Sequence, residues 1–269
     1  MDKNVLAALG LSLFAGLSTS IGGLIVLTIK KVNAKVLSLA LGFSAGVMIY
    51  VSFVEILPEA GRYMESYYGQ GKGDWISFLA FFGGVFLIAI IDKLVPEKSN
   101  PHEPQNAEFF DVCNLGANSA ALIKTGKLTA LVIAIHNFPE GLATFFAAIN
   151  DPSVGIAIAI AVAIHNIPEG ISVAMPIYCA TGNKKKAFGM SLLSGLAEPI
   201  GAILAYLLLA PFMNDAIFGI VFAATAGIMV YISLDELLPS AREYGEHHLS
   251  IWGLIAGMIV MGLSLLLLG

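Results

Sequence analysis

Long apolar segments separated by short polar breaks dominate the hydrophobic pattern of this 269-residue chain. A helix needs about 20 apolar residues to cross the hydrocarbon core of a bilayer. The pattern therefore predicts an all-α, polytopic membrane protein. Its eight transmembrane helices are expected over Val5–Ile29, Val36–Leu57, Trp75–Ile91, Leu128–Ala148, Val154–Ala180, Ala187–Leu209, Ala216–Leu238 and Ile251–Leu268.

The composition supports a membrane protein and excludes two other classes. Hydrophobic residues make up 57% of the chain and charged residues 12%, whereas a soluble domain carries about 25% charged residues. The formal net charge of −5 also lacks the basic surface that nucleic-acid backbones require. The expected surroundings are therefore a lipid bilayer, with no nucleic-acid partner.

The loop charges predict the orientation of the chain, because cytoplasmic loops carry an excess of lysine and arginine. The loops after the first, third, fifth and seventh predicted helices hold eleven of the 14 basic residues. The opposite side holds only Lys3, Arg62 and Lys72. We therefore expect a multi-pass protein of the cell (inner or plasma) membrane, with both termini on the extracytoplasmic side.

The longest polar break runs over Pro96–Lys127 and is rich in proline and acidic residues. Such a composition favours a flexible cytoplasmic linker over a second folded unit. An alternative interpretation is a loop that collects metal weakly, because His102 lies there among several acids. In either case residues 1–269 form a single transmembrane domain.

Two pairs of segments resemble each other across the chain. Gly46–Pro58 matches Gly227–Pro239 at seven of thirteen positions, and Ser12–Leu24 matches Ser191–Ile203 at six of thirteen. Chance similarity between apolar helices explains shared leucine and isoleucine, but not the polar and proline matches Tyr50/Tyr231, Ser52/Ser233, Glu55/Glu236 and Pro58/Pro239. The copies are five predicted helices apart, so they cross the membrane in opposite directions. Inverted repeats are typical of transporters that bind substrate near the midplane.

The central pair of helices contains a repeat of its own, AIHNFPEGLA from Ala134 and AIHNIPEGIS from Ala163. Ionisable residues inside membrane helices are costly and usually functional. At 3.6 residues per turn, Glu140 lies one turn from His136 and Asn137 on the same face. This carboxylate can therefore share one cation with the histidine and another with the asparagine, and the second motif repeats the geometry.

The chemistry of these motifs suits divalent cations. Pro139 and Pro168 each remove a backbone amide and free a carbonyl oxygen, and broken helices are tolerated where they line a polar cavity. Imidazole, carboxylate and amide oxygen, without thiolate, suit Zn²⁺, Fe²⁺, Co²⁺ or Mn²⁺ better than Cu⁺.

Residues outside the motifs extend the candidate site. Glu198 aligns with Thr19 in the repeat, so one copy has gained a carboxylate, which favours a ligand. Met48 can supply a thioether, although the aligned Met229 favours packing.

Two further glutamates lie on the second and seventh predicted helices. The inverted topology places Glu55 toward the outer end of the pore and Glu236 toward the inner end. They either attract ions at entry and exit or are carboxylates at helix ends that reach toward the membrane surface.

The sequences HNFPEG (His136–Gly141) and HNIPEG (His165–Gly170) resemble the paired motifs of the ZIP (Zrt/Irt-like) metal transporters. The resemblance covers essentially all eight helices and implies a 3+2+3 arrangement with a binuclear site between the fourth, fifth and sixth. It implies a zinc site of His136, Glu140, His165 and Glu169. It also implies a second site, for Fe²⁺ or another divalent ion, of Asn137, Glu140, Asn166, Glu169 and Glu198. The family places a methionine where Met48 stands, which favours Met48 as a ligand.

We therefore expect uptake of zinc into the cytoplasm, with iron, manganese, cobalt and cadmium as further cargo, without catalytic residues or a catalytic cofactor. One alternative is an intramembrane metalloprotease, which typically needs an HExxH motif that this sequence lacks. Another is an exporter or channel that uses the same site, because ligands do not reveal the direction of flux. The resemblance argues for import. A homodimer is kept as a candidate assembly.

Overall fold

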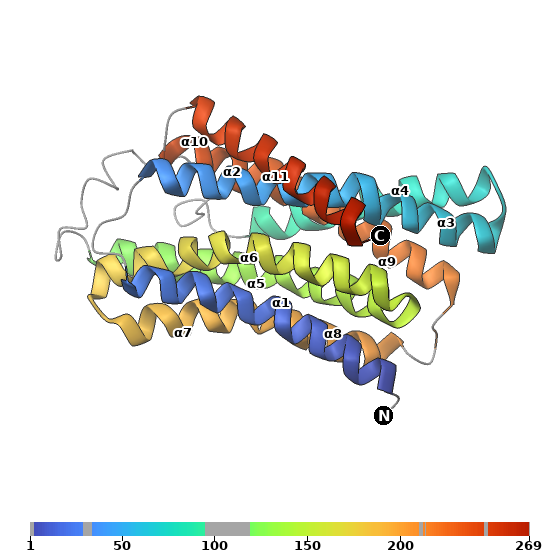
Figure 1. The fold of residues 1–269 in the computed structure, drawn as a ribbon, viewed down its shortest axis with the longest axis horizontal. Helices are drawn as coiled ribbons and strands as arrows, with labels where there is room; N and C mark the ends of the chain where they lie inside the picture. The colour runs from blue at the N-terminus through green and yellow to red at the C-terminus, as the bar shows by residue number, and fades with distance from the viewer. Residues whose placement is uncertain are drawn as a thin grey trace.

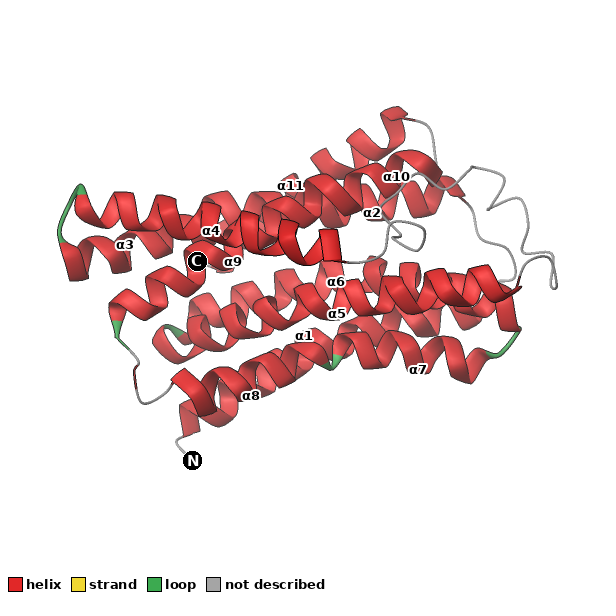
Figure 2. Cartoon of the chain, turned by 180° about the vertical axis from the view of Figure 1, so that it is seen from behind, coloured by secondary structure: helices red, strands yellow, loops and turns green. Residues whose placement is uncertain are grey.

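A computed structural model describes residues 3–28, 34–94, 119–209, 212, 214–244 and 247–268. Within these ranges all regular structure is helical (Figures 1 and 2). In chain order the elements are α1 (Lys3–Thr28), α2 (Ala34–Val51), the π-helical turn η1 (Ser52–Ile56), α3 (Leu57–Tyr68), α4 (Lys72–Leu94), α5 (Ser119–Asn150), α6 (Pro152–Thr181), α7 (Lys184–Gly195), α8 (Ala197–Leu209), α9 (Asp215–Ile232), the π-helical turn η5 (Ser233–Leu237), α10 (Leu238–Tyr244) and α11 (His247–Leu268).

The prediction of eight helices long enough to cross a membrane is confirmed for the described residues. The second and seventh are longer than the hydrophobic pattern indicated and reach Tyr68 and Arg242. The reason is that α3 and α10 continue the helical path beyond the apolar core as amphipathic or charged turns, which a search for apolar runs does not include.

The predicted linker is shorter than its polar composition indicated. Helix α5 begins at Ser119 and not at Leu128, because Ser-Ala-Ala-Leu-Ile-Lys contains mostly good helix formers and no proline. The rest of the predicted linker, including His102, lies outside the described residues.

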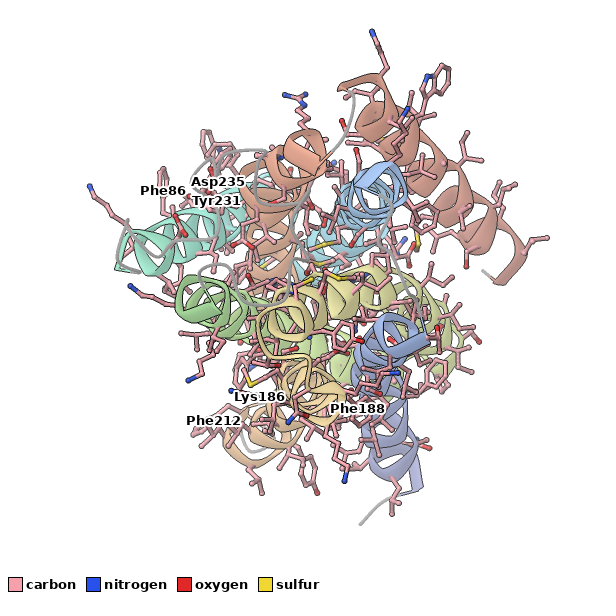
Figure 3. The ribbon with its side chains drawn as sticks, turned by 90° about the vertical axis from the view of Figure 1, so that its left-hand side faces the viewer. Phe86, Lys186, Phe188, Phe212, Tyr231 and Asp235 are labelled. Carbon is pink, nitrogen blue, oxygen red and sulfur yellow. The ribbon has the colours of Figure 1, made fainter. Side chains whose placement is uncertain are left out.

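The helices form two groups. Helices α1, α5, α6, α7 and α8 pack together in one group, and α2, α3, α4, α9, α10 and α11 in the other (Figure 1). Seen from the left-hand end of Figure 1, Phe86 and Tyr231 of the second group lie apart from Lys186 and Phe188 of the first (Figure 3). The groups meet mainly where α2 packs on α6 and where α5 packs on α9.

The two π-helical turns occupy equivalent positions of the inverted repeat. The Ser52 hydroxyl donates to the carbonyl of Met48 at 2.7 Å, and the Ser233 hydroxyl donates to the carbonyl of Met229 at 2.7 Å. Each turn precedes the leucine and proline that the two copies share. Proline offers no amide to the helix, and π-helical turns often occur at functional sites. The two copies of the repeat therefore share the same π-helical turn at the same position.

Helices α1 and α7 cross at a pair of glycines. A Cβ atom on Gly16 would lie 2.3 Å from the carbonyl oxygen of Gly195, and a Cβ atom on Gly195 would lie 2.2 Å from that of Gly16. These two glycines align in the repeat. An approximate twofold axis between the two copies would produce such a reciprocal contact.

Candidate metal centre

The predicted ligands come together from three helices of the first group and one of the second. Helix α5 carries His136, Asn137 and Glu140, while α6 carries the matching trio and α8 carries Glu198. All seven polar side chains are buried, with at most 1% exposed. Met48, on α2, is also fully buried and belongs to the apolar core. Burial in this core does not test its role as a ligand, which stays a prediction.

The histidines and glutamates of the two motifs pair between helices. The Nε2 atom of His136 lies 3.0 Å from Oε2 of Glu169, and Nε2 of His165 lies 3.2 Å from Oε1 of Glu140. The sequence placed each glutamate near the histidine of its own helix. The structure turns each toward the other helix, because two antiparallel copies of one motif present their histidine and glutamate to each other. In the described part of the chain, no three His, Cys, Asp or Glu side chains converge as a metal-binding group.

Several buried oxygen atoms nevertheless have no hydrogen-bond partner. Among the predicted ligands these are Oδ1 of Asn137, Oδ1 of Asn166, Oε2 of Glu140 and Oε2 of Glu198. A buried polar atom without a partner is costly and calls for an explanation. Carboxylate and amide oxygens are hard donors that bind divalent cations, so these unpartnered atoms are suited to a cation between the helices.

The two asparagines are held by their amide nitrogens. Nδ2 of Asn137 donates to the carbonyl of Ser194 at 3.3 Å, and Nδ2 of Asn166 donates to the carbonyl of Ala15 at 3.1 Å. Ala15 and Ser194 align in the repeat. Because the nitrogens are engaged by backbone, the oxygens are the atoms left for a ligand.

Glu198 reaches the centre through a break in the sixth membrane-spanning segment. Helix α7 ends at Gly195 and α8 begins at Ala197, since Pro199 has no amide to bond the carbonyl of Gly195. One oxygen of Glu198 accepts a hydrogen bond from Nδ2 of Asn166. This contact links α8 to α6, and it is the only contact of Glu198 to a motif residue among the hydrogen bonds of the described residues.

Ser44 of α2 is a member of the centre that sequence reasoning missed. Its hydroxyl lies 3.3 Å from the carbonyl of His165 and 3.5 Å from Oε1 of Glu169. A single serine in an apolar segment carries no signal in the sequence. Only the packing of α2 on α6 places it there.

The motif glycines allow the close approach of the helices that carry the ligands. A Cβ atom on Gly141 would lie 2.0 Å from the carbonyl oxygen of Glu198, and one on Gly170 would lie 1.8 Å from that of Thr19. Real Cβ atoms do not approach backbone so closely. Glycine at both positions therefore allows α5 to pack closely on α8, and α6 on α1.

The outlying glutamates differ from each other. Glu236, on η5, is buried. Glu55, on η1, is half-buried. The glutamate of the second copy is therefore the more buried of the two.

Comparison with known proteins finds a family match over most of the chain. The profile of the family described as "ZIP Zinc transporter" matches residues 4–113 and 114–265. Proteins named "Zinc transporter ZupT" are similar along the whole chain. Those of Lysinibacillus sphaericus and Oceanobacillus iheyensis are 60% and 57% identical over 268 residues, covering 100% of both chains. That of Streptococcus mutans is 55% identical over 267 residues, covering 99% of both.

Proposed function

Since this chain belongs to the ZIP family of zinc transporters and is a membrane transporter and not an enzyme, we propose that it carries Zn²⁺ into the cytoplasm through a binuclear site between α5, α6 and α8. The observation that carries the proposal is the set of buried oxygens without partners on Asn137, Glu140, Asn166 and Glu198. A cation would satisfy all four. The cargo is bound and released without chemistry on it.

The first position takes zinc on His136, Glu140, His165 and Glu169. Zinc prefers four ligands drawn from imidazole nitrogen, thiolate and carboxylate oxygen. The two histidine–glutamate pairs at 3.0 and 3.2 Å supply two nitrogens and two carboxylates. An entering cation would bind the histidine nitrogens and the glutamate oxygens, and would replace the contacts between them.

The second position takes Fe²⁺ or another divalent cation on Asn137, Asn166 and Glu198, with the two motif glutamates shared between the positions. Its donors are all oxygen, which suits harder ions better than the first position does. Manganese, cobalt and cadmium are further candidate cargo. Met48 is a candidate extra ligand from α2.

The proposed orientation gives the path of an incoming cation. With both termini outside the cytoplasm, as the lysine and arginine bias indicates, Glu55 lies toward the outer end and Glu236 toward the inner end. An incoming cation would pass Glu55, bind at the centre, and leave past the buried Glu236. An exporter would use the same groups in reverse.

Uptake of radiolabelled metals into proteoliposomes tests this function. We expect Zn²⁺ to accumulate on the side that corresponds to the cytoplasm, with slower accumulation of Fe²⁺, Mn²⁺, Co²⁺ and Cd²⁺. The internal pH and the membrane potential are varied independently, and vesicles without protein serve as the control. Net zinc movement only toward the extracytoplasmic side, in protein of determined orientation, would establish the exporter.

His136→Ala is expected to lower zinc transport more than manganese transport. Loss of one imidazole nitrogen leaves a more oxygen-rich set of ligands, and zinc depends more on nitrogen than manganese does. The measurement is the ratio of initial zinc and manganese uptake rates at equal protein in the membrane. A ratio equal to that of the parent would argue against His136 as a zinc ligand.

Glu198→Gln is expected to reduce occupancy of the second position while the first stays filled. Glutamine keeps the oxygen that accepts from Asn166, so the helix contact survives, but one negative charge is lost. Elemental analysis should give about one zinc per chain with much less iron bound. Anomalous diffraction would locate the remaining ion.

Glu65→Gln makes the same charge change on an exposed side chain of α3 and serves as the control. It should bind metal like the parent. Two ions at parental occupancy in Glu198→Gln would show that Glu198 is not a ligand.

A further inference from the structure

The contacts around the metal centre occur in pairs that the repeat relates. Each residue of one contact aligns with a residue of its counterpart, with offsets of 29 between the motifs and 179 between α1 and α7–α8. The pairs are His136–Glu169 with His165–Glu140, Asn137–Ser194 with Asn166–Ala15, and Gly141–Glu198 with Gly170–Thr19. The centre is therefore close to twofold symmetric in its contacts. The charge differs at one pair of equivalent positions, where one copy has Glu198 and the other has Thr19.

Thr19 is a buried residue whose hydroxyl is not satisfied by its surroundings. Its side chain is 0% exposed, and its hydroxyl oxygen has no hydrogen-bond partner. A helical threonine can bond the carbonyl three or four residues earlier, and the second of these here is Ala15. That carbonyl already accepts from Nδ2 of Asn166 at 3.1 Å and from the Ser18 hydroxyl at 2.6 Å. Because the Thr19 hydroxyl makes no hydrogen bond, its oxygen is available to bind a cation.

The repeat also identifies the neighbour of Thr19. Asn166 donates to Glu198, and the equivalents of these two residues are Asn137 and Thr19. The side-chain oxygen of Asn137 is fully buried and has no partner. A Cβ atom on Gly195 would lie 3.0 Å from the Thr19 hydroxyl oxygen, which places that hydroxyl against α7, the helix to which Asn137 is anchored.

We propose that the hydroxyl of Thr19 and the side-chain oxygen of Asn137 form a neutral half-site for a divalent cation on the α1 side of the centre, as the counterpart of the Asn166–Glu198 half-site. This inference rests on the proposed binuclear site. Two neutral oxygens hold a hard cation more weakly than a carboxylate does. The Thr19 half-site therefore binds the cation more weakly than the Asn166–Glu198 half-site does.

Thr19→Glu tests the half-site directly, because it restores the charge that the repeat lacks on this side. We expect the purified variant to hold one more Mn²⁺ per chain than the parent by elemental analysis. Anomalous diffraction should place that ion between residue 19 and Asn137. Folded Thr19→Glu protein with the same number and positions of ions as the parent would overturn the proposal.

Thr19→Val and Thr19→Ser test the natural residue without adding charge. Valine has the shape of threonine without the oxygen, and we expect it to weaken Mn²⁺ binding by about three- to tenfold, as befits the loss of one neutral oxygen contact. Serine should bind Mn²⁺ like the parent. Thr225→Val, the same change at a buried threonine of α9, is the control. Unchanged Mn²⁺ affinity in Thr19→Val would also overturn the proposal.

These measurements separate the half-site from the binuclear site. A parent protein that binds a single ion contradicts the second position of the proposed function. The half-site is judged by the difference between each Thr19 variant and the parent, whichever number the parent binds.

Discussion

Glu140→Ala and Glu169→Ala are each expected to reduce zinc uptake to the level of vesicles without protein. Each carboxylate serves both proposed positions and also faces the histidine of the opposite helix at 3.2 or 3.0 Å. Its removal therefore takes a ligand from two ions and leaves one buried imidazole without its partner. Loss of a single group beside a metal typically costs 10- to about 100-fold, and a shared ligand should cost more. Radiolabelled zinc uptake at matched protein in the membrane measures the effect.

Glu65→Ala, at an exposed position of α3, is the matched control and should transport zinc at the parental rate. Zinc uptake by Glu140→Ala or Glu169→Ala within a few-fold of the parent would contradict a shared carboxylate. The two variants should also resemble each other, because the contacts of the two glutamates are related by the repeat. A large difference between them would mean that the two positions do not share both glutamates.

Gly141→Ala is expected to lose most transport although it adds only one methyl group. The added Cβ would lie 2.0 Å from the carbonyl oxygen of Glu198 and 2.5 Å from its carbonyl carbon. Backbone cannot yield as a flexible side chain does, so α5 and α8 must separate, which moves Glu198 away from Asn166. Overpacking of this kind costs about 1–3 kcal/mol. We expect a lower thermal midpoint in detergent together with loss of the second cation.

Gly83→Ala is the control for this change. Gly83 lies within α4 and nothing is near enough to meet a Cβ atom there, and alanine favours a helix over glycine by about 1 kcal/mol. That variant should be as stable as the parent or more so, and should transport normally. Parental metal stoichiometry and transport in Gly141→Ala would show that α5 and α8 can separate without disturbing the centre.

The sequence predicted the class of fold well because the bilayer imposes a simple rule on it. Every backbone polar group must be satisfied within the membrane, so each apolar segment of sufficient length becomes a helix. The ends of the helices were less predictable. Helix α3 and the start of α5 are polar, and their sequences alone suggest loops. They nevertheless extend helices that the apolar segments form, and extending a helix is far easier than starting one.

The candidate ligands could be read from the sequence, but the contacts between them could not. His136 and Glu140 stand one turn apart, which suggests that they act together, whereas the structure pairs His136 with Glu169. Ser44 gave no signal at all. Such contacts depend on the angle and depth at which helices cross, and periodicity within one helix carries no information about either.

By itself the sequence determined the eight helices, the inverted repeat and the buried polar residues, because each follows from local hydrophobicity or from a comparison of the chain with itself. Only the tertiary structure decided which histidine faces which glutamate, why Gly141 and Gly170 must lack a side chain, and that Ser44 lies beside Glu169. The physical reason is that these properties arise from contacts between helices. Close packing fixes such contacts to within a methyl group, a precision that the pattern along the chain does not record.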